Sequence, residues 1–145
     1  MQDLGKSVDA LGDSKEIEKA RYNEVSRKLL NEPTGLAGAL GSESVPLPLR
    51  GPYIYYECVV KEAVKPHMRV LDVCCGNGKF SLTAAFAGAK VIAADIAEWG
   101  VLATVKRAQM HGLKIDGVVA DAEGLPFGDQ TFDVVTVTFQ SRPDR

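Results

Sequence analysis

The spacing of hydrophobic and polar residues changes near the middle of the chain. The first part carries apolar residues at roughly helical spacing, whereas the second part carries short apolar runs rich in valine and alanine. Apolar residues three to four positions apart predict amphipathic helices, and short β-branched runs predict buried strands. The chain therefore predicts helices first and an alternating α/β region after them.

Two helices are predicted before this change. The first dozen residues contain two glycines and few apolar groups, so we expect a loose arm there. A helix is predicted to begin near Asp13, which can cap it, and to end before Pro33. Residues 34–51 are rich in glycine and proline and are interpreted as a linker or loop. A second helix is predicted from Pro52 to about Lys65.

Strands and helices alternate after the second helix. The predicted strands are Arg69–Val73, Lys90–Asp95, Gly117–Ala120 and Thr131–Phe139, and the predicted helices are Lys79–Ala87 and Glu98–His111. This order is typical of an α/β fold with a Rossmann-like, doubly wound parallel sheet. We therefore predict a partial sheet of order 3-2-1-4, with residues 1–51 as a helical arm and linker and 52–145 as the ligand-binding domain.

Composition and charge exclude several classes of protein. Hydrophobic residues make up 46% of the chain and charged residues 25%, as in a soluble globular domain. A net charge of −2 provides no basic surface for nucleic acid and no polybasic membrane anchor. No apolar run approaches the roughly 20 residues of a membrane span, and the polar start does not resemble a secretory signal. Three cysteines, two of them adjacent, favour a reduced, cytoplasmic compartment.

Acidic residues stand at or beside three of the four predicted strand ends: Asp72, Asp95 and Asp121. In doubly wound sheets, ligands bind outside the carboxyl ends of the strands, where the strand order reverses. Asp72 is expected to be buried, which is costly unless its carboxylate meets a cation or hydrogen-bond donors. A ligand ammonium group meets that requirement.

Asp95 and Asp121 each allow two interpretations. Asp95 can accept hydrogen bonds from both hydroxyls of a ribose, or it can cap the following helix. Asp121 can accept from an adenine amino group, with the apolar segment Leu125–Phe127 packed beneath the ring, or it can be a surface acid before a turn.

The segment VLDVCCGNG places Gly76 and Gly78 between a predicted strand and a predicted helix. Glycine lets the backbone approach a ligand and leaves amides exposed at a helix N-terminus. The same residues also serve a tight turn that binds nothing. A dinucleotide-binding fingerprint requires a third glycine, and this chain has Ser81 at that place.

The segments VLDVCCGNG, VIAADI and DAEGLPFGDQTFDVV, in this order and spacing, resemble the class I S-adenosylmethionine-dependent methyltransferases. Within that class they are most similar to the small-molecule type 11 group, which includes quinone-biosynthesis C-methyltransferases. The resemblance covers roughly Pro52 to Phe139. It implies a cofactor, S-adenosylmethionine, held at its methionine end by Asp72, Gly76 and Gly78, at its ribose by Asp95, and at its adenine by Asp121, Ala122, Ile96 and Leu125.

Further positions enter the candidate cofactor site through this resemblance. The family usually has glycine where this chain has Cys74, and often threonine or proline where it has Asn77. In similar enzymes the N-terminal helices lie over the cofactor, which makes Tyr22 and Tyr53 candidates. Thr138, at the end of the fourth predicted strand, completes the set.

Other reactive side chains are interpreted as bystanders. His67 precedes the first strand and His111 ends a helix, so both are expected to be solvated rather than catalytic. The adjacent pair Cys74 and Cys75 is expected to be buried and inert, and it lacks the spacing of a metal site. Trp99 is expected to serve in packing.

Three functions remain open on the sequence. The first is a methyltransferase acting on a small molecule, or the cofactor-binding half of one, because the fourth strand lacks the Asn-Pro-Pro-aromatic signature of enzymes that methylate nucleic acid bases. The second is a non-catalytic module that binds S-adenosylmethionine and acts through a partner. The third is a NAD-binding Rossmann domain.

The fourth predicted strand also suggests a protein partner. Enzymes of the family that the chain resembles have three further strands beyond the fourth. Without a neighbouring strand, the segment Val134–Phe139 would form a long apolar edge, and such edges invite pairing. We therefore expect a homodimer, or a complex with a complementary chain, through the fourth strand.

Overall fold

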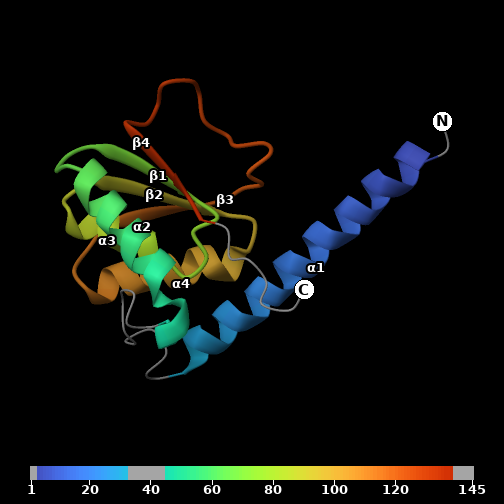
Figure 1. Cartoon of the computed structure of the whole chain (residues 1–145), viewed down its shortest axis with the longest axis horizontal. Coiled ribbons are helices and arrows are strands. Elements are labelled where there is room, and N and C mark those ends of the chain that lie inside the picture. The colour runs from blue at the N-terminus through green and yellow to red at the C-terminus, as the bar shows by residue number, and fades with distance from the viewer. Residues whose placement is uncertain (1–2, 33–44, 139–145) are drawn as a thin grey trace.

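The computed structural model describes the backbone of residues 3–32 and 45–138, and the side chains of residues 14–32 and 45–138. It contains a parallel sheet of four strands in the order β3-β2-β1-β4 (Figure 1). The strands are β1 (Arg69–Val73), β2 (Lys90–Asp95), β3 (Ile115–Val119) and β4 (Val134–Val137). The predicted α/β fold and strand order are confirmed.

The central strands form because both of their faces are buried. Residues Val70 to Val73 of β1 are all buried, and Val70 is completely inaccessible. β1 pairs with β2 on one side and with β4 on the other, so that Asp72 lies between Ala93 and Thr136. A run of β-branched and apolar residues suits this position, because no face is left for polar side chains.

Three helices cover one face of the sheet (Figure 1). They are α2 (Arg50–Ala63), α3 (Lys79–Phe86) and α4 (Glu98–Met110). Their apolar side chains form the main core with the strand residues that point toward them; among its members are Val60, Phe80, Leu82, Val101, Val70 and Ala93. The predicted bounds of these helices differ from the observed ones by at most a few residues.

The opposite face of the sheet carries only a small cluster. Leu71, Val73 and Ala94 are buried there beneath Leu125, Phe127 and Phe132 of the connection between β3 and β4. That connection arches over the sheet in Figure 1. Among the described residues, no helix packs on this face.

The first helix, α1 (Asp3–Asn31), is longer than predicted. The expected loose arm and the expected start near Asp13 are wrong, because the helix continues through both glycines of the first dozen residues. A glycine inside a helix costs only about 1 kcal/mol relative to alanine, and extending an existing helix is easier than starting one. The N-terminal turns of α1 extend beyond the sheet in Figure 1.

Three other boundaries also differ from prediction. β3 begins at Ile115, which is buried and pairs with Val91, rather than at Gly117. β4 begins at Val134 rather than at Thr131, because Phe132 packs against the second face of the sheet instead of extending the strand. The predicted end of this strand, Phe139, lies outside the described residues. The predicted linker lies mostly outside the described residues; its described end forms a short 3-10 helix, η2 (Leu47–Leu49). None of the helices in the described part of the chain has the length and apolar composition of a membrane span.

Candidate functional site

The loop between β1 and α3 forms the centre of the candidate site. Cys75 N–H donates to the carbonyl of Ala94 at 3.1 Å, which ties the loop to the end of β2. Gly78 N–H donates to the carbonyl of Cys75 at 2.9 Å and closes the turn. The loop therefore lies at the carboxyl ends of the two central strands, where ligands of such sheets bind.

Gly76 and Gly78 differ in what surrounds them, although both have positive φ angles of 52° and 82°. A Cβ atom added to Gly78 would lie 2.6 Å from Cγ2 of Thr104, so no side chain fits there. A Cβ atom added to Gly76 would meet nothing within 4 Å. The backbone at Gly76 thus borders open space, and a side chain there would fill it.

Helix α4 packs unusually close to this loop. A Cβ atom on Gly100 would lie 2.9 Å from the carbonyl oxygen of Gly76. The Thr104 hydroxyl donates to that same oxygen at 3.1 Å, and the Arg107 guanidinium donates to the carbonyl of Asn77 at 2.9 Å. These contacts fix the carbonyls of the loop on the helix side. Only the helical glycine was a signal for this contact in the sequence, since glycine is unfavourable inside a helix.

Asp95 supports the loop from the end of β2. Its Oδ2 accepts a hydrogen bond from Gly76 N–H at 2.8 Å, and its Oδ1 accepts from Ala97 N–H at 2.8 Å. The N-cap residue of α4 is Ala97, so the alternative in which Asp95 caps that helix is wrong. Each carboxylate oxygen can accept more than one hydrogen bond. The half-buried Asp95 therefore retains acceptor capacity beside the open space at Gly76.

Asp72 is completely surrounded by protein. Only 1% of the residue is exposed, and its two carboxylate oxygens accept hydrogen bonds from the hydroxyls of Ser81 and Thr136. Burial raises the pKa of the Asp72 carboxyl above its ordinary value, although the two hydroxyls oppose that shift. Two donors from the chain itself satisfy the carboxylate, so its burial requires no ligand ammonium group.

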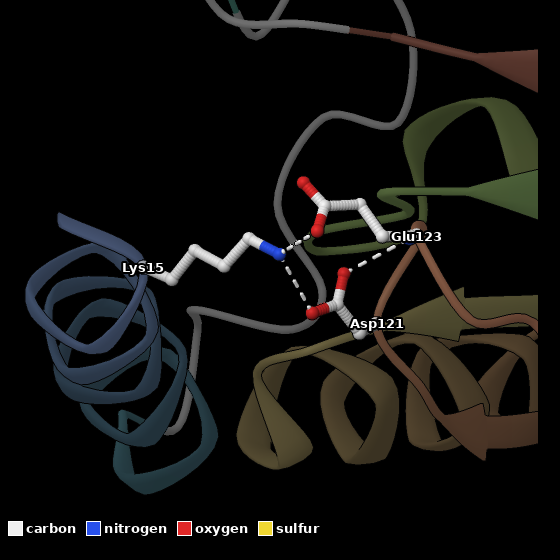
Figure 2. A network of polar contacts seen from close by, with 3 residues as sticks. All are labelled: Lys15, Asp121 and Glu123. Atoms are coloured by element: carbon white, nitrogen blue, oxygen red, sulfur yellow. Dashed lines mark hydrogen bonds and ion pairs between the residues drawn. The ribbon is translucent and has the colours of Figure 1, made fainter. Parts of the chain in front are cut away.

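Asp121 lies after β3 and contacts helix α1 (Figure 2). The ammonium of Lys15 donates to Asp121 Oδ2 at 2.9 Å and also to a carboxylate oxygen of Glu123. Asp121 Oδ1 accepts from Glu123 N–H at 3.0 Å. The hydrogen bonds that Asp121 accepts from Glu123 N–H and from the Lys15 ammonium lower the pKa of its carboxyl below the ordinary value. Both oxygens of the predicted adenine acceptor are thus engaged by the protein.

Two further side chains of α1 contact the candidate site. Asn23 Oδ1 accepts from the backbone N–H of Trp99 at 3.0 Å, at the start of α4. The buried Ser26 hydroxyl donates to Asn77 Oδ1 at 2.8 Å, in the glycine loop. Sequence reasoning missed Lys15, Asn23 and Ser26, because nothing in their local pattern marks contacts across such long sequence separations.

The remaining predicted site residues lie around this centre. Ile96 is half-buried after β2, and Leu125 packs on the second face of the sheet. Ala122 is exposed beside Asp121, and Thr138 is half-buried just after β4. Cys74, half-buried beside Gly76, has a positive φ of 58°, which is costly for any residue with a side chain.

The two candidate tyrosines are placed on different helices. Tyr53 of α2 lies with its ring 4.7 Å from the ammonium of Lys79 and stacks on Phe80, so it is next to the N-terminus of α3. Tyr22 of α1 is half-buried beside Arg21.

The residues interpreted as bystanders lie outside the centre of the site or are inert. His67 is exposed in the turn before β1, and His111 is exposed at the end of α4 against Phe86. Burial raises the pKa of the Cys75 thiol well above its ordinary value, so the thiolate is disfavoured. Within residues 14–32 and 45–138, no three His, Cys, Asp or Glu side chains gather as metal ligands would.

Sequence comparison identifies relatives of this chain. The profile of a family described as a methyltransferase domain matches residues 70–144, just over half of the chain. An uncharacterized protein of Mycobacterium tuberculosis is 40% identical over 97 residues, which cover 67% of this chain and 34% of that protein. A demethylmenaquinone methyltransferase of Clavibacter sepedonicus is 42% identical over 74 residues, covering 51% of this chain and 30% of that enzyme.

Solved structures show the same fold. A dimethyladenosine transferase from Plasmodium falciparum superposes with a TM-score of 0.53 at 26% identity, over 62% of this chain and 32% of that one. The cyclase SpnF superposes with a TM-score of 0.51 at 27% identity, over 56% of this chain and 32% of that one.

This chain spans about a third of the length of curated relatives such as the mycobacterial protein. The matching part contains the glycine loop, the strands and the acids of the candidate site. The chain belongs to the methyltransferase domain family.

Proposed function

We propose that this chain forms the cofactor-binding part of an S-adenosylmethionine-dependent methyltransferase. The observation that carries the proposal is the open space at Gly76, bordered by Asp95 at the end of the neighbouring strand. A backbone without a side chain, next to a carboxylate with acceptor capacity left, suits a ligand that brings hydroxyl groups. Membership in the methyltransferase family supports this ligand over a nicotinamide dinucleotide.

The position of Asp95 and of the glycine loop suits the ribose and the methionine end of this cofactor. Asp95 would accept the ribose hydroxyls, and the backbone at Gly76 and Gly78 would face the methionine end. Asp72 would act behind the loop rather than by direct contact, since its oxygens are taken by Ser81 and Thr136. S-adenosylmethionine supplies an activated methyl group, so the protein mainly has to align the acceptor and exclude water.

We propose a small molecule as the methyl acceptor. The near-neutral charge gives no basic surface for nucleic acid, and a demethylmenaquinone methyltransferase is among the relatives. The described residues provide no enclosed acceptor pocket at the carboxyl ends of the strands, and the matched segment covers 30% of the demethylmenaquinone methyltransferase. The acceptor site is therefore assigned to structure beyond these four strands.

A binding module that acts through a partner is the second candidate. The match to the methyltransferase domain family does not favour it over an enzyme. A homodimer or a complementary chain at β4 would fit this reading as well as the first. The three free cysteines support a cytoplasmic location in either case.

Calorimetric titration of the chain with S-adenosylmethionine, S-adenosylhomocysteine and NAD tests the proposal. We expect heat of binding with the first two and none with NAD. In a methyl-transfer assay we expect no turnover by this chain alone, and multiple turnovers would contradict the assignment of the acceptor site to structure beyond the four strands. Binding of NAD alone, or of none of the three, would contradict the proposed function.

A further inference from the structure

Helix α1 contacts all three loops at the carboxyl ends of β1, β2 and β3. Ser26 bonds Asn77 after β1, Asn23 bonds Trp99 after β2, and Lys15 bonds Asp121 and Glu123 after β3. Of these contacts, only the last one involves a side chain, that of Asp121, that the family resemblance assigns to the adenine of the cofactor. The middle of α1 is therefore held at the adenine part of the site.

The Lys15 contact differs in kind from the other two. Ser26 is 1% exposed and its hydroxyl bond is neutral, whereas the Lys15 and Asp121 side chains are 36% and 41% exposed. Exposed ion pairs are weak and are screened by salt. The part of α1 around Lys15 can consequently move away at low cost, while the part near Ser26 stays attached.

Asp121 is bound to a positively charged donor while Lys15 is in place. One oxygen accepts from Glu123 N–H and the other from the Lys15 ammonium (Figure 2). An adenine amino group is a neutral donor whose hydrogens are partly positive. It would have to approach the carboxylate beside a full positive charge, so the two donors compete for one acceptor.

We propose that Lys15 competes with the adenine amino group for Asp121, so that the ion pair holds α1 across the adenine part of the site and opens when the ligand binds. This inference rests on the proposed function, since it assumes that Asp121 accepts from adenine. It adds a residue that controls access to the site.

Replacing Lys15 tests the competition. Lys15→Met keeps most of the side-chain stem and a high helix propensity but removes the charge. Lys28→Met is the matched control, because Lys28 lies on the same helix and pairs only with Glu24 one turn away among the ion pairs described. S-Adenosylhomocysteine is titrated into the wild-type chain and both variants at low and high salt.

We expect Lys15→Met to bind about twofold to fivefold more tightly than the wild type at low salt, the range of an exposed ion pair. Added salt should bring the wild type closer to this variant, and Lys28→Met should behave as the wild type. Equal or weaker binding by Lys15→Met would overturn the competition while leaving the proposed function intact. Absence of binding by every protein would contradict the proposed function itself, and the competition with it.

Hydrogen exchange of the ligand-free proteins tests the mechanical part separately. Backbone amides of α1 around residue 15 should exchange faster in Lys15→Met than in the wild type and in Lys28→Met. Unchanged exchange would show that Lys15 does not hold the helix, whatever the titration finds.

Discussion

At the scale of single residues, the two glycines of the loop differ: Gly78 has a structural role, and Gly76 borders the proposed ligand site. Gly76 and Gly78 both have positive φ angles, yet only at Gly78 would an added Cβ atom meet a neighbouring side chain, that of Thr104. A substitution at Gly76 mainly strains the backbone and fills the open space. A substitution at Gly78 also forces Thr104 and helix α4 to shift.

We therefore expect Gly76→Ala and Gly78→Ala to fail in different ways. The positive φ costs an alanine about 1–2 kcal/mol at either position, and Gly78→Ala loses more because of the clash with Thr104. Gly76→Ala should keep the fold and lose affinity for S-adenosylhomocysteine. Urea unfolding and calorimetry on both variants measure the two effects. Full affinity in a folded Gly76→Ala protein would mean that the open space is not a ligand site.

Asp95 should carry cofactor affinity through its carboxylate. Losing a hydrogen bond to a charged acceptor costs about 1.5–3 kcal/mol, roughly tenfold to a hundredfold in affinity. Asp95→Asn keeps an acceptor for Gly76 N–H or Ala97 N–H but removes the charge, so it tests binding with less damage to the loop.

The control for this variant is Asp116→Asn on β3, where the carboxylate is exposed and away from the site. Calorimetric titration with S-adenosylhomocysteine compares the two. An Asp95→Asn protein that is folded and binds as tightly as the control would remove Asp95 from the cofactor site.

Asp72 should make stability depend on pH. Burial raises the pKa of its carboxyl from the ordinary 3.8, so the folded state keeps a proton that the unfolded state has already lost. At a pH between the two pKa values, the folded state binds more protons than the unfolded state. The free energy of unfolding therefore falls as the pH rises through this window. Above the folded-state pKa, this loss is complete.

The Asp72→Asn variant lacks this titration. The difference between the wild type and the variant in free energy of unfolding, followed from about pH 4 upward by urea unfolding, should shift against the wild type as pH rises. A difference that stays constant across the range would show that Asp72 ionises with its ordinary pKa.

At the scale of elements, the most accurate predictions concern β1 and β2, whose observed bounds equal the predicted ones. Both are short apolar runs with turn residues on each side, and burial of both faces agrees with that local pattern. Prediction was poorest for α1 and for β4. Whether α1 continues through its glycines, and whether Phe132 joins a strand or packs on the sheet, depends on contacts remote in sequence.

The candidate site also contains residues that the sequence predicts and residues that it does not. Its acids and glycines could be predicted because they follow strands directly, and the topology brings strand ends together. The residues that hold the loop, such as Thr104 and Arg107, come from a helix face whose local pattern looks like ordinary packing. The contacts of α1 could not be predicted, since its sequence does not show which loops it crosses.

Docking of α1 should depend on Ser26. Its buried hydroxyl donates to Asn77, and Ser26→Ala leaves that amide oxygen without this donor. We expect a loss of about 1 kcal/mol in the free energy of unfolding, with faster hydrogen exchange in α1. Ser14→Ala, on an exposed part of the same helix, is the control. Equal stability of the two variants would mean that the bond does not hold α1 to the loop.

At the scale of the whole molecule, the described helices that pack on the sheet all cover the same face. The other face and the edge strand β4 leave apolar groups exposed, with Val135 and Val137 at 55% and 40%. The hydroxyl of Tyr56 bonds both the N–H and the carbonyl of Val137, so this end of β4 offers neither group to another strand. Association would therefore use the remaining part of the edge or the apolar face.

We expect the purified chain to self-associate, or to bind a chain that supplies the rest of the sheet. Val135→Lys places a charge on the exposed face and should reduce association in light scattering. Met110→Lys, equally exposed on α4 at the other face, should leave it unchanged. A wild-type chain that stays monomeric at high concentration would contradict this expectation.

The most direct test of the account is a residue-resolved titration by nuclear magnetic resonance with S-adenosylhomocysteine. We predict shifts at the amides of Gly76, Gly78 and Ala97, which line the proposed cofactor site, and unchanged amides at Gly88 and Gly112, at the other ends of α3 and α4. Saturation without shifts at the glycine loop, or shifts confined to the opposite end of the sheet, would contradict the account.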